Sequence, residues 1–419
     1  MPWRERSVVD ERREFVKLAM LAGANKSELC RRFGISRSKG DKWLKRYQRE
    51  GEKGLVDRSR RPHRSPLRSS QLSEAEVLRI RDGSNNAWGG RKIWKVMEDE
   101  GWPEVPCPST ITAILRRHNR LETNRAEHPG PFKRFERAHP NELWQMDYKG
   151  HFALLQGRCH PLTVLDDHSR YSLGLEACAD EQDPTVRQRI TKIFRRYGLP
   201  LAMIMDNGSP WGGDDRFNGF EVWLMRLGIR VAHGRPYHPQ TQGKDERFHR
   251  SLKAEMLKGK SYCDIEACQR AFDDWRHIYN HKRPHDALGL ETPSTRYRPS
   301  PRTFPEQLPA IAYGPGDQVR TVSIDGFISF RGRPFRIARG LRRQPVALRQ
   351  ATQDGLYEVH FCGQQIAMID LRDNTVRACG FVDAADNPSA DQAPPAAPTT
   401  PQAQHQNKDF EIGKERAEL

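Results

Sequence analysis

Three acidic residues, Asp147, Asp206 and Glu246, have the chemical type and the local setting needed to hold metal ions. Asp147 lies within an apolar run that predicts a strand, where a carboxylate is costly unless it has a function. Asp206 ends a second apolar run before an Asn-Gly-Ser turn, which would expose it at the carboxyl edge of a sheet, where open α/β sheets bind ligands. Glu246 falls in the first turn of a predicted helix.

Acids in this arrangement suit attack on a phosphodiester, because two metal ions ~3.5–4 Å apart stabilise both the entering and the leaving oxygen. Mg²⁺ takes oxygen ligands and needs only a few carboxylates. We therefore expect two Mg²⁺ or Mn²⁺ ions in the site. Arg250 and Lys253 share the helix face of Glu246 at i+4 and i+7, where they would contact DNA phosphates.

Other acids compete for these roles. Asp166 and Asp167 end a predicted strand and could be ligands, although a cap or turn role before the following His-Ser pair is favoured. Asp245 should point about 100° away from Glu246 on an ideal helix, so we expect it to be solvated. Glu255 is expected to pair with a basic neighbour, and Asp214 and Asp215 lie in a Gly-rich loop with no strand before them.

The first fifty residues have the pattern of a helix-turn-helix. Helices are expected at about 10–22 and through Leu29 and Phe33, and Ser36 is a plausible N-cap for a third. The third helix would present a basic face to DNA, or only to solvent if the unit is an ordinary three-helix bundle. The residues on that face are Arg37, Lys39, Lys42, Arg46 and Arg49.

An arginine-rich segment follows at 58–68, with five arginines, two prolines and no acid. Such a segment cannot bury a core and would run extended, either as a linker or along DNA through Arg58, Arg60 and Arg61. A second helical unit is expected at 72–120, with Ser73 as the cap of its first helix. It also resembles a helix-turn-helix, so the N-terminal region would read DNA in two parts.

From residue 141 the pattern changes to short strands followed by helices, which predicts a mixed sheet flanked by helices. Between 313 and 372, short β-forming runs are separated by Asp325-Gly326, Asp354-Gly355 and Cys362-Gly363. These pairs predict hairpins, and about five strands would form a small β-barrel. After about residue 383 the composition predicts a disordered tail.

Composition supports a polyanionic partner. The net charge is +16, and residues 1–136 carry 31 Lys+Arg against 19 Asp+Glu, so most of the surplus lies in the first third. No long apolar run or signal peptide is evident, which favours a soluble protein of a reducing cytoplasm or nucleoid. The eight scattered cysteines form no zinc-binding pattern and are expected to be free thiols.

The runs LWQMDYKG, IMDNGSPW, HPQTQGKDERFHRSLKAE and YNHKRPHDALGLETPSTRY resemble the integrase-type core of bacterial insertion-sequence transposases, a core that retroviral integrases share. The resemblance implies an RNase H-like fold with a triad of Asp147, Asp206 and Glu246, and DNA contacts from Arg250 and Lys253. It also implies an active-site loop shaped by Gln240 and Gly243, with Tyr237 and His238 near the substrate strand. The chain has nothing like the N-terminal His/Cys zinc module of retroviral integrases.

The expected protein is multidomain. Its regions would be a helix-turn-helix domain at 1–57, a basic linker at 58–71, a second helix-turn-helix unit at 72–122, a linker at 123–136, the α/β catalytic core at 137–300, the β-barrel at 301–382 and the tail at 383–419.

The resemblance implies a transposase that binds terminal inverted repeats, cleaves the 3′ ends of its element and joins them to target DNA. Its partners would be double-stranded DNA and further copies of the chain, with no membrane and no small-molecule substrate. Two other functions remain open from the residues: a non-enzymatic regulator that uses only the helix-turn-helix units, and a nuclease that hydrolyses without joining.

Overall fold

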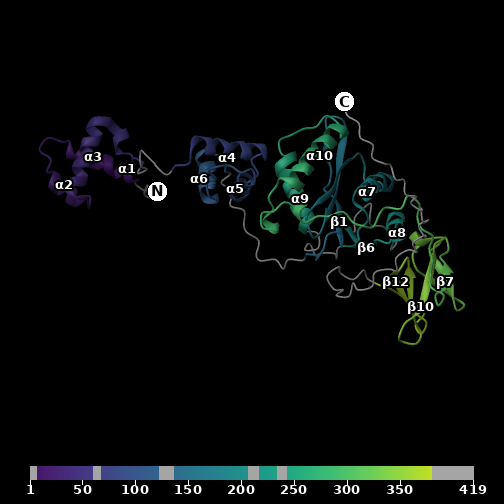
Figure 1. The fold of residues 1–419 in the computed structure, drawn as a ribbon. Helices are drawn as coiled ribbons and strands as arrows, with labels where there is room; N and C mark the ends of the chain where they lie inside the picture. The colour runs from purple at the N-terminus through teal and green to yellow at the C-terminus, as the bar shows by residue number, and fades with distance from the viewer. Residues whose placement is uncertain (1–6, 60–67, 122–135, 206–216, 234–242, 380–419) are drawn as a thin grey trace, which may run out of the picture. The chain divides into compact units, whose positions relative to one another are not determined.

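The computed structural model describes residues 7–59, 68–121, 136–205, 217–233 and 243–379. The chain divides into two compact units, Met1–Ser69 and Ser70–Leu419, which are described separately (Figure 1). The predicted residues Arg60, Arg61 and Asp206, and the loop residues Tyr237, His238 and Gln240, lie outside the described ranges, as do Asp214, Asp215 and the expected tail.

The first unit consists of three helices, as predicted: α1 (Val8–Ala19), α2 (Lys26–Arg32) and α3 (Arg37–Glu50), followed by a 3₁₀ turn (Gly51–Leu55). Ser36 caps α3, because its side chain accepts a hydrogen bond from the Lys39 amide. The core of the unit is built around the buried side chains of Phe15, Trp43 and Leu55.

The second helical unit also has three helices: α4 (Gln71–Gly83), α5 (Gly90–Asp99) and α6 (Pro108–Arg117). The cap expected at Ser73 is wrong, because α4 begins at Gln71 and Ser70 accepts the hydrogen bond from the Ser73 amide. Ser73 instead donates its hydroxyl to the Glu104 carbonyl. Both serines precede acidic and apolar residues, so the local pattern alone does not distinguish them.

The central sheet has six strands in the order β2-β3-β1-β5-β6, with β4 paired to β3. The helices α9 and α10 cover one face, and α7 and α8 cover the other, as the two buried clusters and Figure 1 show. The element bounds are β1 (Trp144–Tyr148), β2 (Phe152–Ala153), β3 (Arg158–Asp166), β4 (Ser172–Cys178), α7 (Asp183–Tyr197), β5 (Ala202–Met205), α8 (Gly219–Arg226), β6 (Arg230–His233), α9 (Gly243–Leu252), a π-helical turn (Lys253–Leu257) and α10 (Ile265–His281).

Strand pairing places the carboxyl ends of β1 and β5 at one edge of the sheet. The two strands run parallel, with Gln145 paired to Ile204, whereas β1 and β3 run antiparallel, with Asp147 opposite Thr163. The core is therefore the mixed sheet flanked by helices that the sequence predicts, and Asp147 lies near the carboxyl end of β1.

The C-terminal region contains seven strands rather than five. They form a five-stranded antiparallel sheet, β13-β12-β11-β10-β7, and a separate pair, β8-β9; within the described residues no pairing closes either into the expected barrel. The bounds are β7 (Gln318–Thr321), β8 (Phe327–Phe330), β9 (Arg333–Arg336), β10 (Pro345–Gln350), β11 (Leu356–Phe361), β12 (Gln364–Asp370) and β13 (Thr375–Ala378).

Two of the three predicted hairpins are confirmed: Asp354-Gly355 joins β10 to β11, and Cys362-Gly363 joins β11 to β12. The hairpin predicted at Asp325-Gly326 is wrong, because β7 pairs with β10 and β8 pairs with β9. A turn does form there, with the Gly326 amide donating to the Ser323 carbonyl, but it redirects the chain between two sheets.

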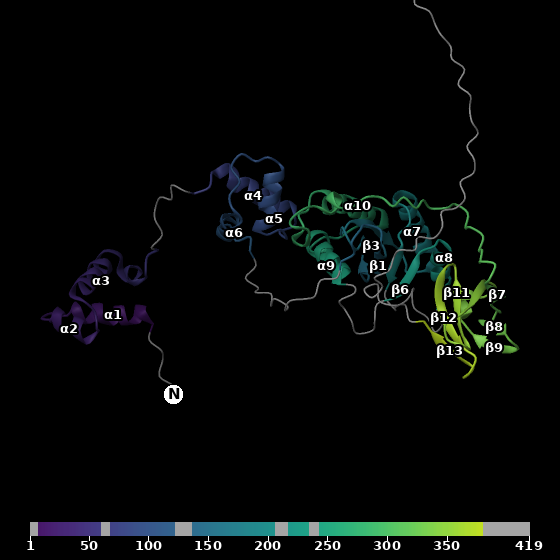
Figure 2. The same ribbon diagram turned by 60° about the horizontal axis from the view of Figure 1, so that its bottom comes forward.

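One hydrophobic core continues from the catalytic sheet into the C-terminal sheets. Figures 1 and 2 both show α8 beside these sheets. A Cβ on Gly340 would lie 1.8 Å from the Phe217 carbonyl oxygen, and Gln364 donates to the Ile229 carbonyl at 2.8 Å.

All eight cysteines are free, as expected. None of the described helices has the length and apolar character required to span a membrane.

Candidate active site and DNA-binding surfaces

Asp147 lies in β1 with its side chain 21% exposed, beside a partly buried hydrogen-bond network. The hydroxyl of Thr163, on the neighbouring strand, donates to the Asp147 carbonyl at 2.9 Å. The same hydroxyl lies 2.9 Å from Nε2 of His249 in α9. Because a hydroxyl has one proton to donate, this network assigns the imidazole proton to Nε2, which donates to Thr163.

The other ring nitrogen of His249, Nδ1, lies 3.9 Å from the Asp147 carboxylate. Burial lowers the pKa of His249 to about 4, and the nearby Lys149 ammonium adds to this effect. At neutral pH the imidazole is therefore uncharged, and it places a lone pair rather than a proton toward Asp147.

Asp166 and Asp167 have structural roles, as the sequence favoured. Asp166 accepts hydrogen bonds from the Ser169 amide and hydroxyl and from the Asn141 amide. Asp167 accepts from the Arg137 amide at 2.9 Å and from Gln145 Nε2 at 2.8 Å, and it forms an ion pair with Lys244.

Asp245 is buried, and the prediction that it is solvated is wrong: its exposed fraction is 1%. Phe248 and Leu252 follow it at i+3 and i+7, so the apolar spacing of α9 turns all three toward the sheet. Within the described structure neither carboxylate oxygen of Asp245 has a hydrogen-bond partner. Burial raises the pKa of Asp245 well above its usual value, and the charges of Asp147 and Asp167 add to the rise.

Glu246 lies in the first turn of α9, as predicted, and is exposed. Arg250 and Lys253 are exposed as well, at the spacing that places them on the same side of the helix. Glu255 lies on the opposite, buried side and pairs with Arg283 at 2.8 Å, which confirms the expected structural role.

The acids at this edge fit a divalent cation only in part. Among the described residues, no three His, Cys, Asp or Glu side chains form a group that could hold a metal ion. The carboxylate of Asp245 is buried, and neither of its oxygens has a hydrogen-bond partner among the described residues. Carboxylate oxygens are the ligands that Mg²⁺ prefers, so Asp147 is of the chemical type that the implied ion needs.

In the first unit, α3 carries the predicted basic face. Arg37, Lys39, Lys42 and Arg49 are exposed. Arg46 is half-buried, because its guanidinium lies 4.8 Å from the Trp43 ring and donates to the Val56 carbonyl. Arg58 forms an ion pair with Glu50 at the end of α3.

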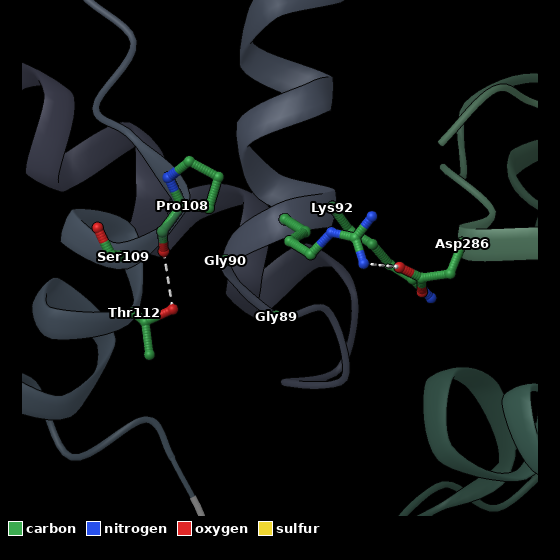
Figure 3. Close-up of a pocket in the computed structure, with 8 residues that line it drawn as sticks. Gly89, Gly90, Lys92, Pro108, Ser109, Thr112 and Asp286 are labelled. Carbon is green, nitrogen blue, oxygen red and sulfur yellow. Dashed lines mark hydrogen bonds and ion pairs between the residues drawn. The ribbon is translucent and has the colours of Figure 1, made fainter. Parts of the chain in front are cut away.

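A cavity of about 400 Å³ lies between the second helical unit and Asp286, which follows α10 in the chain (Figure 3). A Cβ on Gly90 would lie 2.4 Å from the Pro108 carbonyl oxygen, so α5 and α6 approach closely at its wall. The dashed line to Asp286 in Figure 3 is an ion pair with Arg91. The cavity is lined by Gly89, Gly90, Arg91, Lys92, Pro108, Ser109, Thr112 and Asp286, none of which is a predicted catalytic residue.

Family comparisons match most of the chain in separate segments. The integrase core domain family matches residues 137–239, and a second integrase core domain family matches 227–293. The C-terminal domain of the IS481 family transposases matches 317–377. A helix-turn-helix domain matches 11–63, and a homeodomain-like domain matches 40–115.

Two bacterial relatives are proteins of insertion elements. An uncharacterized 39.2 kDa protein of insertion element IS476 from Xanthomonas euvesicatoria is 25% identical over 177 residues, which cover 42% of this chain and 49% of that protein. An uncharacterized 31.7 kDa protein of IS407 from Burkholderia multivorans is 25% identical over 156 residues, 37% of this chain and 54% of that protein. The chain thus spans about half the length of these relatives.

Among solved structures, the chain is similar to a simian T-cell lymphotropic virus intasome. The identity is 14%, the match covers 68% of this chain and 91% of that chain, and the TM-score is 0.37. The magnesium-bound catalytic core of HTLV-2 integrase matches 38% of this chain at 16% identity and a TM-score of 0.31.

Proposed function

Because the chain belongs to the bacterial insertion-sequence transposases that carry an integrase core, we propose that it cleaves the 3′ ends of its element and joins them to target DNA. The observation that carries this proposal is the position of Asp147. It lies on β1, whose parallel partner β5 ends at the same edge of the sheet, and α9 packs against this edge.

The proposed catalytic acids are Asp147, Asp206, which follows β5 in the sequence, and Glu246 in the first turn of α9. Two Mg²⁺ or Mn²⁺ ions held by these acids would stabilise the charge on the entering and leaving oxygens. The exposed cations Arg250 and Lys253 would hold the phosphate backbone beside Glu246. His249 contributes a neutral, fixed imidazole that keeps the surroundings of Asp147 rigid.

The helix-turn-helix units would bind the terminal inverted repeats, with α3 in a major groove. Arg37, Lys39 and Lys42 are the exposed cations of α3 that suit this role, together with the Arg58–Arg61 segment. Two element ends must be brought together for joining, so we infer that the chain acts as a homo-oligomer on double-stranded DNA. The C-terminal sheets would add DNA or subunit contacts.

The test is a cleavage and strand-transfer assay on labelled element ends with Mg²⁺. Asp147→Asn should reduce both reactions by about a thousandfold, because several kcal/mol of transition-state stabilisation depend on the metal ligands. Binding to the ends should persist, and Asp274→Asn, an exposed acid of α10, should be fully active. Full activity of Asp147→Asn would refute the assignment, and pre-cut ends that are never joined would identify a nuclease instead.

A further inference from the structure

The first turn of α9 carries a lysine that is bound to the end of β3. The ammonium group of Lys244 donates hydrogen bonds to the carboxylate of Asp167 and, at 3.2 Å, to its carbonyl oxygen. The side chain of Lys244 is 16% exposed, and that of Asp167 is fully buried. The apolar contacts of α9 come later in the helix, from Phe248 and Leu252. Lys244 therefore attaches the turn that contains the proposed catalytic glutamate.

The carboxylate of Asp167 also holds β1, the strand of Asp147. Its oxygen Oδ1, which binds Lys244, accepts a second hydrogen bond from Gln145 Nε2 at 2.8 Å. Gln145 lies two residues before Asp147 in β1, so both side chains lie on the same face of the sheet. That face is the one that α9 covers, because the alternate residue Met146 belongs to the core on the opposite face. One carboxylate oxygen thus joins α9 to β1.

This link connects the two elements that carry proposed catalytic acids. Lys244 lies two residues before Glu246 in α9, as Gln145 lies two residues before Asp147 in β1. Each pair is joined by the backbone of a regular element, so the position of the lysine constrains the start of the glutamate's turn. The spacing between that turn and β1 is therefore set where both side chains meet, at Asp167.

A buried ion pair is a costly way to attach a helix. Removing both charges from water offsets much of their attraction, and apolar residues of similar size often stabilise such a position more. Directed hydrogen bonds instead fix a geometry, as supporting side chains do around active sites. A second polar contact has the same direction: His249 binds the Thr163 hydroxyl, which donates to the Asp147 carbonyl. Polar contacts thus tie α9 to the strand of Asp147 at two points.

We propose that Lys244 is a positioning residue for the cleavage and joining reactions. Through its bonds to Asp167 it holds the first turn of α9 at a fixed place over β1, so that Glu246 and Asp147 are preorganised for the same metal ions. In this role Lys244 contacts neither the metal ions nor the reacting atoms. The inference rests on the proposed function, from which it takes the roles of Glu246 and Asp147.

The first test is the maximal rate of strand transfer at saturating DNA and Mg²⁺. Lys244→Met should lower this rate by about a hundredfold, the cost of misplacing a catalytic group by about 1 Å, and leave the affinity for element ends unchanged. Lys244→Arg keeps a charged donor and should recover at least about tenfold of the loss. Glu255→Gln is the matched control, because it breaks the buried ion pair with Arg283 beyond the end of α9, and it should keep the wild-type rate.

A double variant separates positioning from stability. Lys244→Met leaves the Asp167 carboxylate buried with one partner fewer, so its melting temperature should fall. Lys244→Met combined with Asp167→Asn removes both charges and should melt higher than Lys244→Met, yet it should transfer strands as slowly because the link is still absent. If the rate recovers together with the melting temperature, or if Lys244→Met has the wild-type rate, Lys244 has only a structural role and the proposal is overturned. If Lys244→Met does not fold, the double variant is compared with Glu255→Gln directly.

Hydrogen exchange provides a readout that needs no activity. The amides of residues 247–250 donate to the carbonyls of the first turn, so they should exchange faster in Lys244→Met and at the wild-type rate in Glu255→Gln. If the wild type cleaves no DNA, the proposed function fails, and unchanged exchange in Lys244→Met would refute the positioning role as well. If the wild type is active, Asp147→Asn is inactive and Lys244→Met is fully active, only the positioning role is refuted.

Discussion

Neighbouring residues on α9 have opposite surroundings. Glu246 is exposed beside two cations, whereas Asp245 is buried against the sheet without a hydrogen-bond partner among the described residues. His249 shares the buried side at i+4 from Asp245 and fixes the helix to Thr163 of β3. One side of α9 therefore exposes Glu246, and the other packs against the sheet that carries Asp147.

The neutral state of His249 makes a pH-dependent contribution to stability. The imidazole has a pKa of about 4 in the fold and about 6.5 in the unfolded chain. As the pH falls, the unfolded chain therefore binds a proton at His249 before the folded chain does. The contribution of His249 to the free energy of unfolding is complete above pH 6.5 and is lost as the pH falls toward 4. In EDTA, lowering the pH from 7.5 to 5 should cost about 2 kcal/mol at this residue.

Urea unfolding at the two pH values measures this effect. His249→Gln should lose about 2 kcal/mol less than the wild type over that interval. His277→Gln, at an exposed histidine of α10, should keep the wild-type dependence. An unchanged pH dependence in His249→Gln would mean that His249 is not held neutral.

The sequence was sufficient to place Asp147 in a strand and Glu246 in the first turn of a helix, because both depend on local patterns. The burial of Asp245 could also have been predicted, because Phe248 and Leu252 follow it at i+3 and i+7. The prediction failed because it considered only the angle between Asp245 and Glu246. The link between His249, Thr163 and Asp147 joins residues far apart in the chain, and no local pattern predicts it.

At the scale of elements, the crossing of α5 and α6 depends on a glycine. The first residue of α5, Gly90, faces the Pro108 carbonyl and the Thr112 hydroxyl at distances that leave no room for a Cβ. Gly90→Ala should therefore destabilise the second helical unit by about 1–3 kcal/mol through overpacking. Gly89→Ala is the matched control, because nothing lies within 4 Å of its Cβ position. Chemical unfolding of the two variants distinguishes them.

The basic face of α3 should set the salt dependence of end binding. Each phosphate contact contributes about 0.9 to the slope of log K against log salt concentration. Lys39→Ala and Lys42→Ala should each reduce the slope by about that amount, and Lys17→Ala, exposed on α1, should not. Fluorescence anisotropy between 50 and 200 mM salt is the measurement. Equal slopes in all three variants would exclude α3 as the DNA-binding helix.

Hairpins illustrate which elements local sequence can predict. Both correctly predicted turns join strands that pair directly with one another, so the turn residues and the pairing agree. At Asp325-Gly326 the turn forms, but β7 finds its partner in β10, more than twenty residues away. Turn chemistry determines the local bend, and the choice of partner depends on long-range packing.

At the scale of the molecule, the catalytic sheet and the C-terminal sheets share one core. They should therefore unfold together, although local patterns suggest a boundary near residue 300. Phe335→Ala, in β9, removes a side chain that is 2% exposed and should cost about 3–5 kcal/mol. Hydrogen exchange should then speed up in β1 and α8 as well as in the C-terminal strands.

Phe327→Ala provides the comparison, because Phe327 lies in the paired strand β8 and is 39% exposed. Its exchange pattern should resemble that of the wild type. Faster exchange confined to the C-terminal strands of Phe335→Ala would show that the two regions unfold independently.

The contact between Gly340 and the Phe217 carbonyl also limits how such a protein can diversify. A C-terminal region exchanged with that of a relative would have to fit the backbone that directly precedes α8. The new region could pack against the catalytic core only if it also had a glycine at the position of Gly340. In proteins that have exchanged this region, the exchanged segment should therefore begin before residue 217. It would then contain both α8 and the C-terminal sheets that pack beside it.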